Sequence, residues 1–279
     1  MKRILLLSAC LCAALPVYSQ GFTVLSYRMG ALGNQDDAIG LTEYRLSLPG
    51  PQLGWKEGVR LGTTFGYHHA DFGSDFRFWG NAPMDSWMAG ASLSVQMNEK
   101  SILMLGSAAR FSRLGVGKFT NQRLFHQSGL TYQRAFRKYS LWIAGVAYRN
   151  GVVLSLIPIV GFQGRFGASM SADILLPGKA YIWKELSSRR ALGLFARYQT
   201  TPYPGPVVSN VQNSVLRHRM IRTGLAYEEV IAPRWSLRAD VAATVVHDRK
   251  LALGGDAIEL PTDAGIILDI ALVYRVNAR

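Results

Sequence analysis

Hydrophobic and polar residues alternate along this chain in repeated segments of about ten residues, the length of a strand that crosses a membrane. In one segment the apolar side has Val59, Leu61, Thr63, Phe65 and Tyr67, and the other side has Arg60, Gly62, Thr64, Gly66 and His68. Successive side chains of a β-strand point to opposite faces of a sheet, so each segment has one apolar face and one small or polar face. The pattern therefore predicts β-strands throughout the chain.

The alternation predicts fourteen strands, near residues 22–31, 38–48, 58–70, 85–97, 101–113, 124–137, 139–149, 157–167, 169–177, 180–186, 190–200, 214–228, 235–248 and 263–276. Short links such as 98–100 alternate with long links such as 72–84, as the turns and loops of a transmembrane barrel do. We predict an all-β fold, one antiparallel up-and-down transmembrane β-barrel. Twelve strands is the alternative, because the segments 169–177 and 180–186 are short.

A soluble β-sandwich would show the same alternation, with the apolar faces packed together as its core. The long strands and the Gly, Ser and Ala residues on the second face favour a barrel. Aromatic residues near the strand ends also fit a barrel, because such rings favour the headgroup level of a membrane; they are Tyr67, Trp87, Tyr132, Phe136, Tyr198, Tyr227, Trp235 and Tyr274. The segment following the leader has no run of 18 apolar residues, so a transmembrane helix is not expected.

The first residues have the features of a secretory signal peptide. Lys2 and Arg3 precede an apolar stretch at 4–15, and Val17-Tyr18-Ser19 predicts cleavage before Gln20. We predict a signal peptide at 1–19 and a single barrel domain at 20–279. A lipoprotein box ending at Cys10 is the alternative, although it would leave an apolar core too short for a normal leader.

Cysteine content and charge restrict the chemistry further. Both cysteines, Cys10 and Cys12, fall in the predicted leader, so disulfides, thiolate catalysis and cysteine metal sites are not expected in the barrel. The formal net charge of +13 would suit a nucleic-acid partner. However, the basic residues are spread singly along strands, no nucleic-acid-binding motif is present, and an exported chain does not meet nucleic acid. We expect no nucleic-acid partner, no cofactor and no metal.

Three short segments resemble a family of Gram-negative outer-membrane β-barrels that is classed as a domain of unknown function. They are Tyr148-Arg149-Asn150-Gly151, Ile157-Pro158-Ile159-Val160-Gly161, and Leu175-Leu176-Pro177 followed by Ala180-Tyr181. In that family a Pro-x-x-Gly strand precedes a Leu-Pro corner and an aromatic strand. The resemblance implies a barrel fold and a location in the cell outer membrane. It implies no activity and no site residues.

Charged residues on the face opposite the apolar one form a candidate lumen cluster; they are Arg60, Arg110, Arg197, Arg222, Arg238, Asp240, Asp269 and Arg275. A turn centred on Ile231 would place Arg222 across from Asp240. Inward charges of this kind either pair to fill a barrel or line an aqueous channel that prefers anions.

Two arginines lie on the apolar face just after a long predicted outer loop. Arg217 and Arg219 share that face with Ile221 and Leu225. An outward arginine at this end would lie at headgroup depth, and its guanidinium can bind phosphate bidentately. We therefore predict that these residues contact outer-membrane lipid, specifically lipopolysaccharide. The alternative is a solvated strand extension above the membrane.

Histidines provide the remaining candidate chemistry. His126 and Ser128 share the outward face of one strand, an arrangement similar to that of lipid A deacylases, in which a histidine activates a serine. The expected Asn is Gly129 here, and the next strand has no acid to orient the histidine. His68 and Asp71 could bind a metal, but adjacent His68 and His69 point to opposite faces. His218 and His247 have no evident partners in the sequence.

We therefore expect a non-enzymatic outer-membrane barrel, either a narrow pore or a structural, surface-interacting barrel. Its expected partners are outer-membrane lipid, in particular lipopolysaccharide, and the barrel-assembly machinery during biogenesis. The alternative function is a lipid-modifying hydrolase, like a lipid A deacylase, that uses His126 and Ser128. Strand number alone does not decide whether the lumen is open, because side chains or a loop can fill it.

Overall fold

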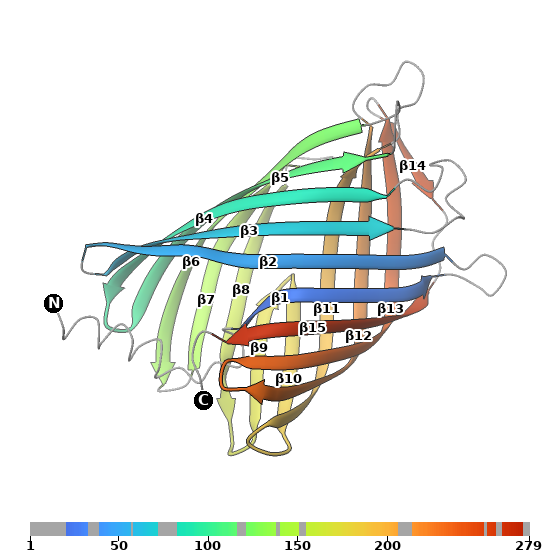
Figure 1. Ribbon diagram of the computed structural model, residues 1–279. Coiled ribbons are helices and arrows are strands. Elements are labelled where there is room, and N and C mark those ends of the chain that lie inside the picture. The colour runs from blue at the N-terminus through green and yellow to red at the C-terminus, as the bar shows by residue number, and fades with distance from the viewer. Residues whose placement is uncertain are drawn as a thin grey trace.

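A computed structural model describes residues 21–32, 39–56, 58–71, 83–115, 121–137, 140–150, 155–205, 214–253, 256–260 and 264–275. The predicted signal peptide lies outside these residues. The described residues form the following strands (Figure 1): β1 (Gly21–Leu32), β2 (Ile39–Lys56), β3 (Val59–Asp71), β4 (Met84–Asn98), β5 (Ser101–Leu114), β6 (Asn121–Arg137), β7 (Ser140–Arg149), β8 (Ser155–Phe166), β9 (Met170–Leu176), β10 (Lys179–Glu185), β11 (Arg190–Pro204), β12 (Val215–Ala232), β13 (Trp235–Leu253), β14 (Asp256–Leu260) and β15 (Gly265–Arg275).

The strands form one closed antiparallel barrel. Each strand from β1 to β13 pairs with the next along the chain, and β15 pairs with both β13 and β1. The short strand β14 pairs only with the end of β13, so it lies outside the circuit. The barrel wall therefore has fourteen strands, which confirms the predicted number and excludes twelve. No helix in this part of the chain is long and apolar enough to cross a membrane.

The strand β14 was not predicted, because the sequence indicated a loop from Arg249 to Leu260. Instead β13 continues to Leu253 and forms a hairpin with β14. An ion pair between Lys250 and Glu259 joins the two strands of this hairpin. Opposite charges across an antiparallel pair stabilise it, which favours extension of the sheet beyond the barrel wall.

The two ends of the barrel differ in their connections. Tight links such as those between β4 and β5 and between β12 and β13 define what we call the turn end, where Gly21 pairs with Arg275. Longer links, such as those between β3 and β4 and between β11 and β12, define the loop end. The link between β9 and β10 is an exception, because it is tight although it faces the loop end.

Strand β2 is longer than predicted. The sequence indicated an end at Leu48, whereas β2 continues to Lys56 with register shifts between Pro49 and Gln52 and between Gly54 and Lys56. Prolines cannot donate to a ladder and are tolerated at bulges. The register shifts therefore accommodate the prolines, and β2 continues past the position where the sequence predicts its end.

The apolar faces of the strands point away from the lumen. Phe65, Leu225 and Ile270 are 53%, 53% and 40% exposed, whereas the inward Ser86 and Asp240 are buried. A β-sandwich would bury the first set, so the sandwich alternative is wrong. The barrel shows the predicted apolar outer face, whereas its inner face is polar only in part, because two apolar clusters also point inward.

Aromatic rings gather near both ends of the outer face. Near the loop end, the ring of Trp87 lies 5.9 Å from that of Tyr67 and 6.1 Å from that of Phe111. Near the turn end, the rings of Trp235 and Tyr274 lie 5.0 Å apart. Of the other predicted aromatic residues, Tyr198 is near the middle of its strand, and the rest are in the turn half of theirs: Tyr132, Phe136 and Tyr227. Rings in two such belts are typical of barrels that span membranes.

Candidate functional site

The lumen contains most of the charged residues that the sequence singled out. The pairing register places Arg60, Arg110, Arg197, Arg222, Arg238, Asp240 and Asp269 on the inward face. The side chain of Arg275 lies outside the described residues. The inward set does not form one cluster, because Arg60 and Arg110 are on strands away from the two aspartates.

Arg28 is the centre of the buried ion network, and the sequence reasoning missed it. Its Nη2 atom lies 2.8 Å from Oδ2 of Asp269, and its Nη1 atom forms an ion pair with Glu43. All three residues are at most 4% exposed. A buried charge needs a partner because its desolvation is costly, and here each charge has one. The same alternation that identified Asp269 also places Arg28 and Glu43 on the inward faces of β1 and β2.

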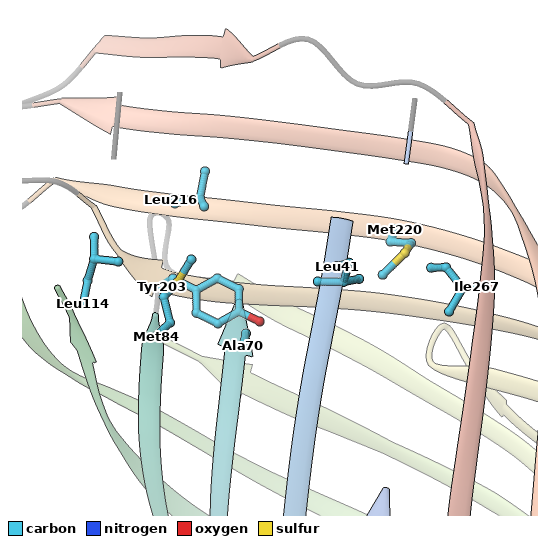
Figure 2. Close-up of a cluster of buried hydrophobic side chains, with 8 residues drawn as sticks. All are labelled: Leu41, Ala70, Met84, Leu114, Tyr203, Leu216, Met220 and Ile267. Atoms are coloured by element: carbon cyan, nitrogen blue, oxygen red, sulfur yellow. The ribbon is translucent and has the colours of Figure 1, made fainter. Parts of the chain in front are cut away.

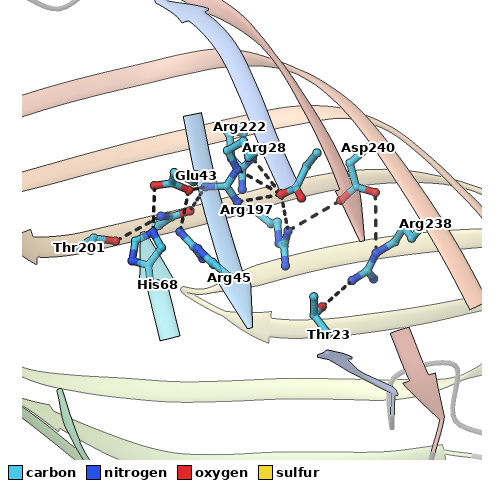
Figure 3. A network of polar contacts seen from close by, with 12 residues as sticks. Thr23, Arg28, Glu43, Arg45, His68, Arg197, Thr201, Arg222, Arg238 and Asp240 are labelled. Carbon is cyan, nitrogen blue, oxygen red and sulfur yellow. Dashed lines mark hydrogen bonds and ion pairs between the residues drawn. The ribbon is translucent and has the colours of Figure 1, made fainter. Parts of the chain in front are cut away.

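Two aspartates face each other in this network. Asp240 and Asp269 are direct cross-strand partners on β13 and β15. Arg197 lies 3.8 Å from Asp240 and 3.9 Å from Asp269. Arg222 adds a contact of 3.7 Å to Asp269, and Arg238 one of 3.9 Å to Asp240 (Figure 3). Like charges directly opposite one another destabilise a sheet, so the surrounding arginines are what makes this pair tolerable.

The predicted alignment of Arg222 with Asp240 is wrong. Arg222 pairs with Thr244, and Asp240 lies across from Ala226. The turn falls between Ala232 and Trp235 rather than at Ile231, and β12 and β13 shift register twice. A shift of this kind changes which residues face each other, and local alternation does not reveal it.

The network reaches across the barrel and not only along its wall. Arg28 on β1 donates a hydrogen bond of 3.1 Å to Gln199 on β11. Tyr203 on β11 donates one of 3.4 Å to Glu43 on β2, and Tyr181 on β10 donates one of 3.4 Å to Asp240 on β13. In each of the three contacts, the two strands that are joined are not neighbours in the sheet. These contacts therefore fill the lumen where they occur.

An apolar layer lies above the network, close to the loop end (Figure 2). Its members come from strands on both sides of the lumen and are all less than 5% exposed; they are Leu41, Ala70, Met84, Leu114, Tyr203, Leu216, Met220 and Ile267. Inward residues of a barrel are usually polar when they line water. At this level buried apolar side chains, rather than polar ones, occupy the lumen between these strands.

The loop-end part of β11 leaves its neighbour β10 and packs against the opposite side. Pairing of β11 with β10 ends at Arg197, and Tyr198 donates a last backbone hydrogen bond of 2.9 Å to Gly178. Beyond that point β11 contacts β5 and β6. Alternate residues of a strand direct their backbone groups to the same edge, so the carbonyls of Thr200 and Pro202 face the side that β10 no longer covers.

Two arginines occupy this uncovered edge of β11. Arg149 of β7 donates a hydrogen bond of 2.9 Å to the carbonyl of Thr200, and Arg110 of β5 donates one to the carbonyl of Pro202. Within the described part of the chain, neither arginine forms an ion pair with a carboxylate. Proline at 202 has no N–H to satisfy at this edge. The edge therefore presents carbonyls, and the arginines bind them.

The inward faces of β3 to β6 remain more open. Thr64 is exposed although it points inward, and its inward neighbours Gly62 and Gly90 are only partly buried. Farther along the same strands toward the loop end, Ala70 and Ser86 are fully buried. On β3 and β4 burial thus increases toward the loop end, where the apolar layer lies.

The histidine candidates have different partners from those expected. His126 on the outward face places its Nε2 atom 2.9 Å from Oγ of Ser107 on β5, and its ring lies 6.0 Å from that of Tyr148. Ser107 is the direct cross-strand neighbour of Ser128. The structure therefore brings His126 to a serine that the sequence did not single out, because that contact is between strands.

The other histidines are structural or paired. His68 points inward, 3.6 Å from Glu43, and His69 points outward, with its Nδ1 atom 2.8 Å from Oδ1 of Asp85. His218 and His247 place their Nε2 atoms 2.9 Å apart inside the lumen, so each is the other's partner. Across the described residues, no three His, Cys, Asp or Glu side chains are grouped so that they could hold a metal.

Arg217 and Arg219 lie on the outward face at the loop end, as their alternation predicts. The Nη2 atom of Arg219 lies 2.6 Å from Oδ2 of Asp248 on β13. Arg217 is the direct cross-strand neighbour of Lys250. Three basic side chains thus share a small outward surface above the apolar band.

Comparison with known proteins gives similarity to solved barrels only. The translocator domain of the autotransporter NalP from Neisseria meningitidis is 12% identical, with a TM-score of 0.41 over 98% of this chain and 93% of that chain. The TodX monoaromatic hydrocarbon channel deltaS2 mutant is 8% identical, with a TM-score of 0.39 over 97% and 94%. The KdgM porin in complex with disordered oligogalacturonate is 8% identical, with a TM-score of 0.35 over 90% and 97%.

No family model and no curated protein matches the sequence. The resemblance to the barrel family of unknown function therefore stays a prediction. Because these three TM-scores are below 0.5, the assignment of a fourteen-strand barrel rests on the strand pairing of this chain. The strand pairing of this chain establishes an up-and-down β-barrel, and buried side chains occupy its lumen near the loop end.

Proposed function

We propose that this chain is a non-enzymatic outer-membrane β-barrel that interacts with lipid at the cell surface and has a closed lumen. The predicted signal peptide, the apolar outer face and the two aromatic belts support a location in the outer membrane. The loop end would then face outward from the cell, because outer loops are longer than periplasmic turns.

The observation that carries this proposal is the filling of the lumen. The ion network joins Arg28 and Glu43 to residues on the far side, and the apolar layer above it is almost fully buried. A solute would have to break buried ion pairs and wet an apolar layer to pass. Of the two functions expected from the sequence, this arrangement favours the structural, surface-interacting barrel over the narrow pore.

Single-channel recording tests the proposal. The refolded protein, incorporated in planar lipid bilayers, should give no steady conductance at moderate voltage. A stable, anion-selective conductance would overturn the closed lumen in favour of a pore. Membrane fractionation combined with heat-modifiable gel mobility tests the location separately, and recovery of the folded protein in the inner membrane or the soluble fraction would contradict it.

The outward basic surface supports lipopolysaccharide as the lipid partner. Arg217, Arg219 and Lys250 lie together above the apolar band. Lipid phosphates are found at this depth, and a guanidinium can bind them bidentately. The barrel-assembly machinery remains the expected partner during insertion.

The contact of His126 with Ser107 favours a second candidate function, a lipid-modifying hydrolase. A histidine 2.9 Å from a serine hydroxyl is within reach to act as its general base. Ser107→Ala and Ser128→Ala variants separate the two serines. Loss of lipid deacylation in either variant would establish this second function, and unchanged acyl chains in the lipid of cells with and without the protein would exclude it.

A further inference from the structure

The hairpin of β9 and β10 is shorter than the strands on either side of it. Both strands have 7 residues, whereas β8 has 12 and β11 has 15. Pairing of β8 with β9 ends at Val160, and pairing of β11 with β10 ends at Arg197. Figure 1 shows the turn between β9 and β10 well below the loop end. The wall therefore has a notch between β8 and β11 that opens toward the loop end.

The residues at this notch are suited to strand edges. Residues 156–159 of β8 pair only with β7, and Pro158 lies among them. On the other side Pro202 and Pro204 lie in the part of β11 that β10 does not cover. Proline in sheets is confined almost entirely to edges and bulges, because it has no N–H for a ladder.

The backbone groups at the β11 edge also have partners inside the protein. Arg149 and Arg110 bind the carbonyls of Thr200 and Pro202. An unsatisfied backbone group in lipid costs several kcal/mol, which normally forbids open edges in a barrel. Here the arginines bind two carbonyls, and Pro202 and Pro204 have no N–H, so the penalty of the uncovered β11 edge is smaller than that of an ordinary open strand edge.

Apolar side chains lie on both faces of the wall beside the notch. On the outside Leu156, Val160 and Leu176 are 69%, 56% and 52% exposed. On the inside Ile157, Ile159 and Leu175 are partly buried. The ion network lies on the inward faces of β1, β2, β11, β12, β13 and β15. The apolar outer surface of the barrel is thus continuous, around the rim of the notch, with an apolar strip of the inner wall.

We propose that this notch is a lateral portal through which an acyl chain of an outer-leaflet lipid enters and lies against Ile157, Ile159 and Leu175. The inference rests on the proposed function, because it requires that the loop half of the barrel lies in the outer leaflet. The occupant follows from the surroundings. Hydrocarbon would cover Leu156, Val160 and Leu176 on the outside. On the inside the nearest charged side chains, Lys179 and Asp173, form an ion pair with each other, which leaves Ile157, Ile159 and Leu175 for an apolar chain.

Site-directed spin labelling tests the portal in the intact barrel. The cysteines of the sequence are Cys10 and Cys12, both within the predicted leader, so a single introduced cysteine in the barrel can be labelled cleanly. Ile157→Cys reports on the inner wall at the notch. Ala108→Cys is the matched control, because it also points inward but its strand is paired on both sides, with Gly90 and Gln127. Leu156→Cys reports on the outer face.

The labelled proteins are refolded into phosphatidylcholine vesicles, and power saturation measures collision with oxygen, which partitions into lipid, and with a water-soluble nickel chelate. The nitroxide at 157 should show the oxygen preference of the nitroxide at 156, and the nitroxide at 108 should not. If 157 behaves like 108 while 156 collides mainly with oxygen, the portal is refuted and the membrane barrel stands. If 156 collides mainly with nickel, the proposed membrane location fails and the portal fails with it. Heat-modifiable mobility of each labelled variant verifies that it is folded.

Discussion

The guanidinium of Arg149 on β7 donates a hydrogen bond of 2.9 Å to the backbone carbonyl of Thr200 on β11, across the lumen from its own strand neighbours. Arg110 makes the equivalent contact with Pro202. These two side chains bind backbone carbonyls at the edge of β11 that has no neighbouring strand. They bind the part of β11 that the short strand β10 leaves uncovered, and they hold it inside the lumen near the loop end.

Removing both arginines should open the barrel. In an Arg110→Ala/Arg149→Ala variant, the β11 edge loses two charged donors, and we expect a stability loss of about 1.5–3 kcal/mol for each hydrogen bond. We also expect transient conductance in planar bilayers, in contrast to the silence that the closed lumen predicts for the parent protein. Arg113→Ala is the control, because Arg113 is on the same strand as Arg110 but points outward. A double variant as silent as the parent would mean that these arginines do not hold the lumen shut.

Removing the central arginine of the ion network should destabilise the barrel strongly. Arg28→Met leaves Glu43 and Asp269 buried without this partner, and breaking a buried pair typically costs about 3–5 kcal/mol. Urea unfolding of the refolded protein measures the loss. The triple variant Arg28→Met/Glu43→Gln/Asp269→Asn should recover most of it, because it removes the charges together. A triple variant less stable than Arg28→Met would contradict this explanation.

Close approach of two strands explains one inward glycine. A Cβ atom on Gly224 of β12 would lie 1.9 Å from the carbonyl oxygen of Val241 on β13, whereas one on Gly106 of β5 would have no neighbour within 4 Å. Gly224→Ala should therefore lower the unfolding free energy by about 1–3 kcal/mol, the usual range for overpacking. Gly106→Ala, its matched control, should be near neutral. Equal effects in urea unfolding would show that backbone spacing is not the cause.

The orientation of the two faces gives a direct test in lipid. Leu225 points outward, so Leu225→Arg should destabilise the membrane-inserted barrel by about 2–4 kcal/mol if it lies near the bilayer midplane. Thr64 points inward and is exposed, and Thr64→Arg should be tolerated. Unfolding from vesicles compares the two variants. The reverse ranking would show that the inner and outer faces have been assigned the wrong way round.

The outward basic surface should bind lipopolysaccharide through both arginines. An Arg217→Ala/Arg219→Ala variant is expected to co-purify with less lipopolysaccharide than the parent, as measured by mass spectrometry of extracted lipid A. Asp248→Asn is the companion variant, because it releases Arg219 from its ion pair and should keep or increase the bound lipid. Unchanged lipid in the double variant would rule out this contact.

Local alternation was sufficient to predict the barrel. Side chains of a strand alternate with a period of two residues whatever the rest of the fold does, so fourteen segments and their outward faces can be identified from the sequence. The same rule predicts that Arg197, Arg222 and Asp269 all face inward. The rule also places Arg28 and Glu43 on the inward face. It does not predict their ion pairs, because the partners lie on other strands.

Contacts between strands depended on the tertiary structure. The turn between Ala232 and Trp235, together with the register shifts of β12 and β13, separates Arg222 from Asp240, and the contact of His126 with Ser107 joins neighbouring strands. The bonds from Arg149 and Arg110 to β11 cross the lumen. The sequence by itself determined which side most residues of the regular strands face, because that depends on neighbours along the chain. Only the closed barrel decided which residues meet, because bulges, strand lengths and the path across the lumen are set by the whole sheet.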